Sequence, residues 1–277
     1  MEERDNRSGS VHFRRSAPPP RHGDVVRFLY RLSSPGGSQA LPNHPQGAVD
    51  LLFVTKGRAS FQKDGQQVSA EAGGTLLVPL QTRPFQFVFA PGTDVLGITL
   101  EPVGSRELLG RPPGDADSCH LLTERSHPRL GVLRRQLDRD TSLGTLERWL
   151  MQERRSTAEG PDLATLLDEL GLRAATRLTA GDLASELGLS TRSLQRMFRT
   201  ELGLSPRTAL RLARFQHALK LLRAGGRTKL ADTALAAGYF DQAHFANEFR
   251  AFAGLSPTRF LERKEPLVEA FAESTGG

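Results

Sequence analysis

Four side chains that could read the edge of a base recur at helical spacing late in the chain. Arg192, Gln195, Arg196 and Arg199 fall at i, i+3, i+4 and i+7, so a helix would carry them on one face. Arginine can bond guanine through two donors and glutamine can pair with the adenine edge, while Arg199 is better placed for a phosphate. The ordinary alternative is a solvated helix face. No acidic residue interrupts this one before Glu201, so we favour a DNA-reading surface.

The residues around this face predict the elements that would position it. Leu183 to Leu187 indicates a short first helix, and Gly188 suits a tight turn because glycine tolerates the left-handed conformation. Ser190 is a good cap for a second helix over 191–202. Leu194, Met197 and Phe198 would share its inward face. Two helices joined by a short turn containing glycine are typical of a helix-turn-helix.

The same pattern recurs about fifty residues later. At a constant offset of 51, five residues of the first copy match five of the second: Leu194, Phe198, Gly203, Ser205 and Pro206 against Phe245, Phe249, Gly254, Ser256 and Pro257. In the second copy 231–237 is the expected first helix, Gly238 the turn, Asp241 the cap and 242–252 the second helix. We therefore predict two helix-turn-helix motifs.

The outward face of the second copy is less basic. It offers Gln242, Ala243, Ala246, Asn247 and Arg250, with His244 near the edge. Asn247 can read adenine and the alanines can touch thymine methyl groups. His244 is either a structural hydrogen-bonding residue or a DNA contact. We expect the first motif to supply most base discrimination and the second mainly to position the protein.

A long helix is predicted between the motifs. Ser205-Pro206 is a cap followed by proline, and Leu212, Phe215, Leu219 and Leu222 recur at helical spacing until Gly225-Gly226. About 18 residues would span roughly 27 Å, against roughly 34 Å for one DNA turn. One subunit could then read two successive major grooves, with DNA bending improving the register.

Composition bounds the class of protein. The net charge is +6, and residues 178–264 hold 11 Arg and 3 Lys against 7 Asp or Glu, leaving 23 basic and 24 acidic residues elsewhere. This asymmetry favours a polyanionic partner. A single cysteine, Cys119, excludes an intrachain disulfide and a zinc site built on several cysteines. No secretory signal or membrane span is visible, so we expect a cytoplasmic protein without a membrane partner.

The front half has β-strand character. Apolar runs at 48–55 and 75–80, the Asp64-Gly65 turn and the alternating aromatics of 85–89 predict a small sandwich or barrel. Phe53, Phe85, Phe87 and Phe89 are expected as core, with the lining of an effector pocket as the alternative. Helical spacing over 129–150 indicates either a cover on the β core or a subunit contact.

Residues from about 162 to 263 resemble the DNA-binding domain of the AraC/XylS family of transcription regulators. The resemblance is carried by Leu183 to Gly188, Leu194 to Phe198, Gly238-Tyr239 through Phe249, and Gly254 to Pro257. It implies that the second helix of each motif enters a major groove. Arg192, Gln195 and Arg196 would then contact bases in the first motif, and Gln242, Ala243, His244, Ala246 and Asn247 occupy the corresponding places in the second.

The front region resembles the cupin-like sensing domains of that family, and residues 72–79 are similar to a cupin strand. The histidine cluster of cupin enzymes is missing, because His22 and His44 stand alone and His120 and His127 lie seven apart. We therefore predict no metal, no other cofactor and no catalytic residue.

The fold class that follows is α+β, with a small N-terminal β-barrel or cupin-like domain and helical extension before an all-α domain with two helix-turn-helix motifs. The expected parts are a mobile arm at 1–22, a sensing domain at 23–112, a helical extension and linker at 113–160, a DNA-binding domain at 161–264 and a tail at 265–277.

The function predicted is sequence-specific transcription regulation, as activator or repressor, with Ser190 joining the DNA-binding residues as the cap of 191–202. The partners expected are double-stranded DNA, a small-molecule effector of unknown site, RNA polymerase and a second copy of the chain. The alternatives are a nonspecific architectural DNA-binding protein and a cupin-type enzyme fused to a DNA-binding domain.

Overall fold

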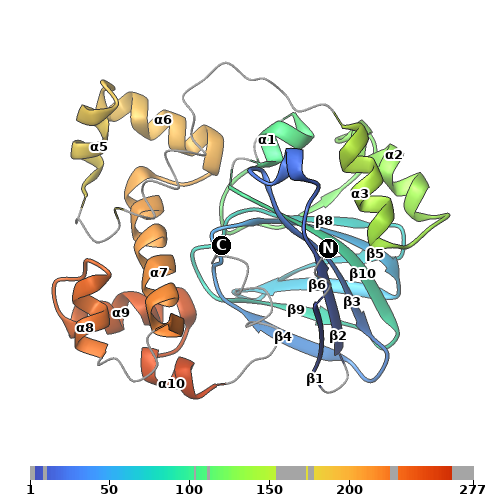
Figure 1. Cartoon of the computed structure of the whole chain (residues 1–277), viewed down its shortest axis with the longest axis horizontal. Coiled ribbons are helices and arrows are strands. Elements are labelled where there is room, and N and C mark those ends of the chain that lie inside the picture. The colour runs from blue at the N-terminus through green and yellow to red at the C-terminus, as the bar shows by residue number, and fades with distance from the viewer. Residues whose placement is uncertain are drawn as a thin grey trace.

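A computed structural model describes residues 4–8, 11–102, 104–110, 113–153, 173, 178–224 and 230–263. A β-rich part comes first and a helical part follows, lying side by side in Figure 1. The predicted α+β class is confirmed. The end of the predicted helical extension and linker, at 154–160, the start of the predicted DNA-binding domain at 161–172 and the predicted tail lie outside the described residues.

The larger sheet holds seven strands whose pairs are all antiparallel. In spatial order they are β1 (Arg4–Ser8), β2 (Val11–Ser16), β3 (Val26–Ser34), β10 (Thr93–Leu100), β5 (Val49–Lys56), β8 (Thr75–Val78) and β11 (His120–Leu122). The longest strands, β3, β5 and β10, lie together at its centre. Their mostly apolar sequences fit this position, because both faces of the sheet are covered there.

The smaller sheet holds four antiparallel strands in the order β4 (Gln39–Asn43), β9 (Phe85–Phe89), β6 (Arg58–Lys63) and β7 (Gln66–Glu71). Asp64 and Gly65 both have positive φ, as a two-residue hairpin turn between β6 and β7 requires. The two sheets do not join into a closed barrel. Of the two architectures that the sequence allowed, the structure adopts the sandwich.

The space between the sheets is filled by apolar side chains from both. Alternate residues of β9 point inward, so Phe85, Phe87 and Phe89 join this core beside Tyr30. Phe53 belongs to the cluster on the opposite face of the larger sheet. The four phenylalanines therefore line no common pocket, and the expectation that they form core is correct.

Helices cover the outer face of the larger sheet. They are α2 (Pro128–Leu137) and α3 (Leu143–Gln152), and α1 (Gly104–Leu109) adds Leu108 to the same cluster. Leu133, Leu146 and Trp149 are buried there. The guanidinium of Arg134 donates to the carbonyl of Val54 at 2.8 Å, which ties α2 to the end of β5. The predicted cover on the β core is therefore present.

The prediction of a mobile arm at 1–22 is wrong for most of that segment. Residues 4–8 and 11–16 form strands, and β2 pairs with β3 along its length. The η1 turn (Pro20–His22) follows. The alternation of Val11 and Phe13 with polar residues places both side chains inward, where the ring of Phe13 stacks on Tyr30 at 5.7 Å between centroids.

The helical part contains α5 (Ala180–Glu186), α6 (Thr191–Leu202), α7 (Pro206–Ala224), α8 (Leu230–Ala236), α9 (Gln242–Ala253) and α10 (Pro257–Glu262). In Figure 1, α7 runs between the pair α5–α6 and the pair α8–α9. Among the described residues, none of the helices is long and apolar enough to span a lipid bilayer.

Replacing Gly97 by alanine should destabilise the sandwich. A β-carbon at this position in β10 would lie 2.0 Å from Cζ of the buried Tyr30 ring, so the ring or the strand must move. We expect a loss of about 3 kcal/mol from this overpacking. Urea unfolding followed by fluorescence of Trp149, the single tryptophan, measures it. Gly37→Ala is the control, because nothing lies within 4 Å of its built β-carbon; equal losses in both variants would contradict the packing argument.

Candidate nucleic-acid interface

The first motif is built from local hydrogen bonds that its sequence specifies. Thr179 and Asp182 form a reciprocal capping box at the start of α5. Gly188 has φ +63° in the turn, and the hydroxyl of Ser190 accepts from the backbone N–H of Ser193 at 3.1 Å. At the other end of α6, Gly203 takes the left-handed conformation of a C-cap. The predicted helix-turn-helix is therefore present.

The two faces of α6 differ as the sequence predicts. Leu194, Phe198 and Leu202 are buried, whereas Ser190, Arg192, Gln195, Arg196 and Arg199 are exposed. Within the described part of the chain, none of the three arginines has a carboxylate partner. The outward side of α6 is thus a cationic surface, and its donors are available to an external acceptor.

The second motif has the same architecture and a different surface. The carboxylate of Asp241 accepts from the backbone N–H of His244 at 2.7 Å and caps α9. Phe245, Phe249 and Phe252 are buried on one side of the helix. The predicted surface residues Gln242, Ala243, His244, Asn247 and Arg250 are exposed, and Ala246 is half-buried.

His244 has a structural role that is visible in its contacts. Its Nδ1 accepts from the backbone N–H of Phe240 at 3.4 Å, and its ring meets Tyr239 edge-on at 5.4 Å between centroids. The side chain therefore ties the turn of the second motif to the first turn of α9. Of the two roles considered for His244, these contacts support the structural one, although the residue is exposed.

The second motif is fastened to α7 by a charged pair that the sequence analysis did not find. Nε of Arg211 donates to Oε1 of Glu248 at 2.6 Å, and the guanidinium lies 5.4 Å from the ring centre of Phe252. Arg214 lies in the same way over Tyr239, at 5.7 Å. Sequence spacing could not reveal these pairs, because the partners come from different helices.

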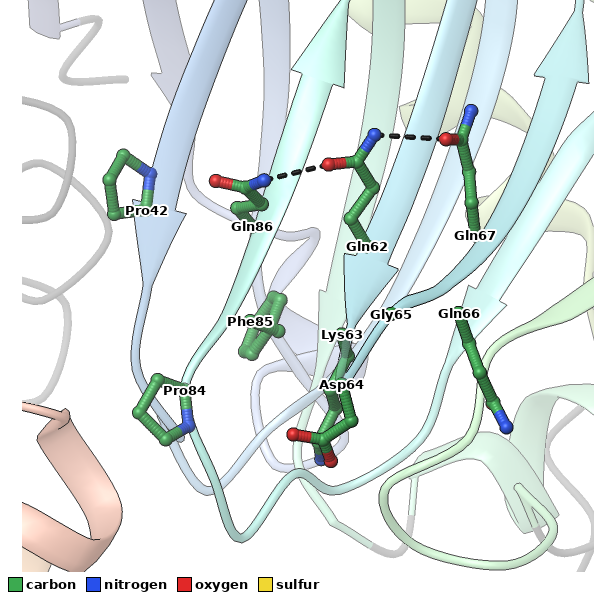
Figure 2. A pocket seen from close by; sticks show the side chains of 10 residues that line it. All are labelled: Pro42, Gln62, Lys63, Asp64, Gly65, Gln66, Gln67, Pro84, Phe85 and Gln86. Atoms are coloured by element: carbon green, nitrogen blue, oxygen red, sulfur yellow. Dashed lines mark hydrogen bonds between the residues drawn. The ribbon is translucent and has the colours of Figure 1, made fainter.

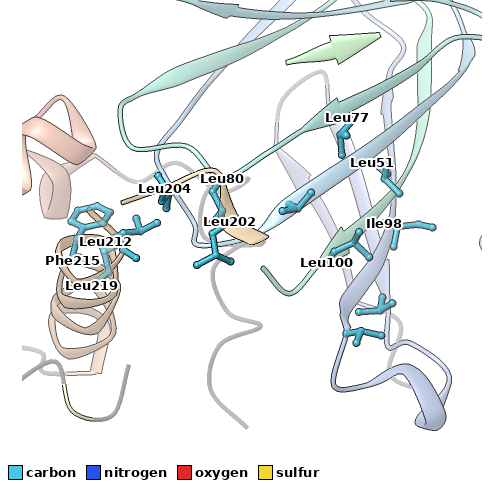
Figure 3. Packing of buried hydrophobic residues seen from close by; sticks show 14 of the residues in the cluster. Leu51, Leu77, Leu80, Ile98, Leu100, Leu202, Leu204, Leu212, Phe215 and Leu219 are labelled. Atoms are coloured by element: carbon cyan, nitrogen blue, oxygen red, sulfur yellow. The ribbon is translucent and has the colours of Figure 1, made fainter. Parts of the chain in front are cut away.

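The β-rich part packs against both motifs, and we call this contact the interdomain seam. Arg106 on α1 forms an ion pair with Glu201 at the end of α6, and the backbone N–H of Ala116 donates to the carbonyl of Gly203 at 3.4 Å. The side-chain amide of Gln216 on α7 donates to the carbonyl of Pro45. Figure 3 shows Leu80 close to Leu202 and Leu204, and all three belong to one buried cluster that runs through both parts.

A buried histidine lies at the centre of the seam. The ring of His44 meets Phe260 of α10 at 5.2 Å and Phe215 of α7 at 6.2 Å, edge-on in both cases. Burial, with a smaller contribution from the charge of Arg223, lowers the pKa of His44 from 6.5 to about 3. The closed seam therefore holds this imidazole in its neutral form at neutral pH.

A polar hollow of about 600 Å³ lies on the outer face of the smaller sheet (Figure 2). Pro42, Gln86, Gln62 and Gln67 are cross-strand neighbours there. The side-chain amides of the three glutamines form a chain, in which Gln86 donates to Gln62 at 2.7 Å and Gln62 donates to Gln67 at 3.0 Å. The hollow lies outside the two motifs.

The described residues form neither a metal-binding cluster nor a reactive thiol. No group of three or more His, Cys, Asp or Glu side chains in the described ranges could hold a metal ion. Burial raises the pKa of the Cys119 thiol to about 12, which keeps this thiol protonated at neutral pH.

A family model and several solved structures are similar to parts of this chain. Residues 183–263 match the family model of a helix-turn-helix domain. A search of the curated proteins finds no match. Among solved structures, ToxT from Vibrio cholerae is 11% identical with a TM-score of 0.48, over 82% of this chain and 98% of that one.

Two further structures are similar to a smaller share of the chain. A DNA-binding transcriptional dual regulator from Escherichia coli K-12 is 29% identical over 39% of this chain and 96% of its own, with a TM-score of 0.34. A regulator with an AraC-type DNA-binding domain from Chromobacterium violaceum is 25% identical over 38% and 95%, with a TM-score of 0.35. At these TM-scores the likenesses carry no argument about ligands or contact residues.

The matched domain and its exposed cationic helix define a DNA-binding transcription regulator. The resemblance that the repeat predicted is confirmed, and the chain carries a helix-turn-helix domain of the AraC type at residues 183–263.

Lowering the pH should open the seam through His44. An exposed histidine binds a proton near pH 6.5 and the buried one only near pH 3, so the stability of closure is complete above pH 6.5 and falls as the pH drops toward 3. At pH 5 opening should increase up to about 30-fold, or ~2 kcal/mol. Hydrogen exchange of residues 212–219, corrected for its intrinsic pH dependence, measures this opening.

His44→Gln is the matched control, because it removes the titrating group and keeps a polar side chain. The pH response of the seam should then largely disappear. Asp50 lies within the sandwich, where its carboxylate accepts from Thr99, and burial raises its pKa from 3.8 to about 6. Its contribution to the stability of the sandwich is therefore lost as the pH rises through 6, which is opposite in sign to the effect of His44. An unchanged response in the glutamine variant would show that another group drives the opening.

Proposed function

We propose that this regulator reads two successive major grooves of one duplex, with α6 in the first groove and α9 in the second. The observation that carries the proposal is the exposed set Arg192, Gln195 and Arg196, which faces away from the buried side of α6. Arginine and glutamine are suited to guanine and adenine edges in a major groove. Arg199, one turn further along, is assigned to a phosphate.

The spacing of the motifs supports the two-groove arrangement. The 19 residues of α7 span about 28 Å at 1.5 Å per residue. One helical turn of DNA is roughly 34 Å, so α7 holds the motifs at a separation comparable with successive grooves, and bending of the duplex would complete the fit. The Arg211–Glu248 pair and the aromatic contacts of Phe215 make this connection rigid.

A small-molecule effector is assigned to the β-rich part, acting on DNA binding through the interdomain seam. The seam touches the end of α6, the middle of α7 and α10, so a change in the sandwich would reach both motifs. Wild-type ToxT from Vibrio cholerae has been solved with an unsaturated fatty acid bound. Footprinting of the upstream region of this gene, with and without candidate small molecules, tests responsiveness; an identical footprint with every compound would argue against it.

An architectural protein that binds DNA without sequence preference is the second candidate, since the basic surface alone would serve it. The ratio of specific to nonspecific binding at stated salt separates the two functions.

Arg196→Ala should lower this ratio more than Asn247→Ala. Loss of one bidentate base contact is worth about 1–3 kcal/mol, or roughly 5- to 150-fold in affinity for the selected sequence. Affinities for a selected duplex and a random duplex, measured by fluorescence anisotropy, give the ratio.

Arg199→Ala should weaken binding to the selected and the random duplex alike, as expected for a phosphate contact. It should also reduce the slope of log affinity against log salt concentration by about 1.

Arg139→Ala is the control, because this exposed arginine lies after α2, on the helical cover of the sandwich. It should leave both affinities near those of the unchanged protein. A larger loss of discrimination from Asn247→Ala than from Arg196→Ala would reverse the division of labour between the motifs.

A further inference from the structure

The turns of the two motifs differ by one residue. After the first helix the copies align at an offset of 50: the N–H of Leu189 donates to the carbonyl of Ala184, as that of Tyr239 does to Ala234, each at 2.9 Å. From the N-cap onward the offset is 51, since Ser190 corresponds to Asp241. The residue that has no counterpart in the first motif is Phe240.

Phe240 is also the most exposed large apolar side chain of the described residues, at 71% of its surface. Its backbone is held in place, because its N–H donates to Nδ1 of His244 and the ring of His244 packs on the buried Tyr239. The aromatic side chain is therefore presented immediately before the cap of α9, at the end of the helix where Gln242 and Ala243 are exposed.

The leading end of α9 has no arginine and adds exposed apolar groups to its polar side chains, whereas the face of α6 is cationic. The face of α6 carries Arg192, Arg196 and Arg199, whereas that of α9 carries one arginine, Arg250, in its last turn. Near its start α9 offers Phe240, the exposed Ala243 and the half-buried Ala246. An exposed aromatic ring gains free energy when a partner removes it from water. In a major groove the apolar group available for such a contact is the C5-methyl of thymine.

We propose that Phe240 is a specificity-determining residue of the second motif and selects thymine in the half-site that α9 reads, through apolar contact with the thymine methyl group. The proposal rests on the proposed function, because it requires α9 to enter a groove. The two motifs then recognise different chemistry: the first reads hydrogen-bonding edges with arginine and glutamine, and the second reads methyl groups with Phe240 and Ala243.

Uracil substitution tests the contact directly, because deoxyuridine differs from thymidine only by the missing methyl. The full chain first selects duplexes from a random pool. Deoxyuridine then replaces thymidine in one half-site at a time, and affinities are measured by anisotropy at fixed salt. In the half-site read by α9 the substitution should weaken binding about 3- to 10-fold, as expected for one or two lost methyl contacts. In the half-site read by α6 it should change little.

Variants connect this loss to Phe240. Phe240→Ser should bind the thymidine duplex about 3- to 10-fold more weakly and show no further loss on uracil substitution, whereas Phe240→Leu should keep much of the discrimination. Leu235→Ser is the matched control, because Leu235 is also exposed, at 59%, and lies on α8 before the turn. It should bind as the unchanged protein does. Unchanged unfolding midpoints confirm that all three variants fold.

Three results would overturn the assignment. In the first, Phe240→Ser keeps both the affinity for DNA and the response to uracil substitution. In the second, it keeps both and loses only transcription with RNA polymerase, which would mean that the ring contacts a protein. Equal losses from Leu235→Ser would indicate a general apolar effect. Failure of the unchanged protein to select any sequence is a separate outcome, which refutes the proposed function itself.

Discussion

The ring of Phe215 lies where three parts of the chain meet, and the arrangement of the motifs depends on it. It stacks on Phe252 at 4.9 Å and meets Phe249 at 5.2 Å, while its other neighbour is His44 of the β-rich part, at 6.2 Å. Buried aromatic rings contribute much apolar area and hold defined geometries. This one residue therefore links the second motif to α7, the helix between the motifs, and to the sandwich.

The same buried cluster explains why the exposed surfaces of α6 and α9 can differ so much. Each helix needs only its inward face to be held. Leucine and phenylalanine do this in α6, phenylalanine alone does it in α9, and a left-handed glycine C-cap ends both helices. Apart from His244, the outward residues of the two helices take no part in this buried packing, so one face is cationic and the other nearly neutral. In the second motif the additional turn residue is accommodated because His244 and Tyr239 hold the backbone on either side of it.

Much of the helical part was predictable because its local rules are strong. Caps at Ser190 and Asp241, glycine turns at Gly188 and Gly238 and a 3.6-residue apolar period place α6 and α9 almost to the residue, whereas α5 begins three residues before the predicted Leu183. The hairpin turn at Asp64-Gly65 was equally clear. Residues 11–16 were misread as mobile because one short polar-flanked strand carries little periodicity of its own, and its pairing with β3 is a distant contact.

The order of the amino acids was enough to specify the helix-turn-helix repeat, the cationic face of α6 and the strand character of the front half, since each depends on neighbours within a few positions. Folding in three dimensions set the rest: the β domain is an open sandwich, Arg211 pairs with Glu248 and His44 is buried against Phe260. These features join residues far apart in the chain, and their energy comes from desolvation and packing, which no local spacing records.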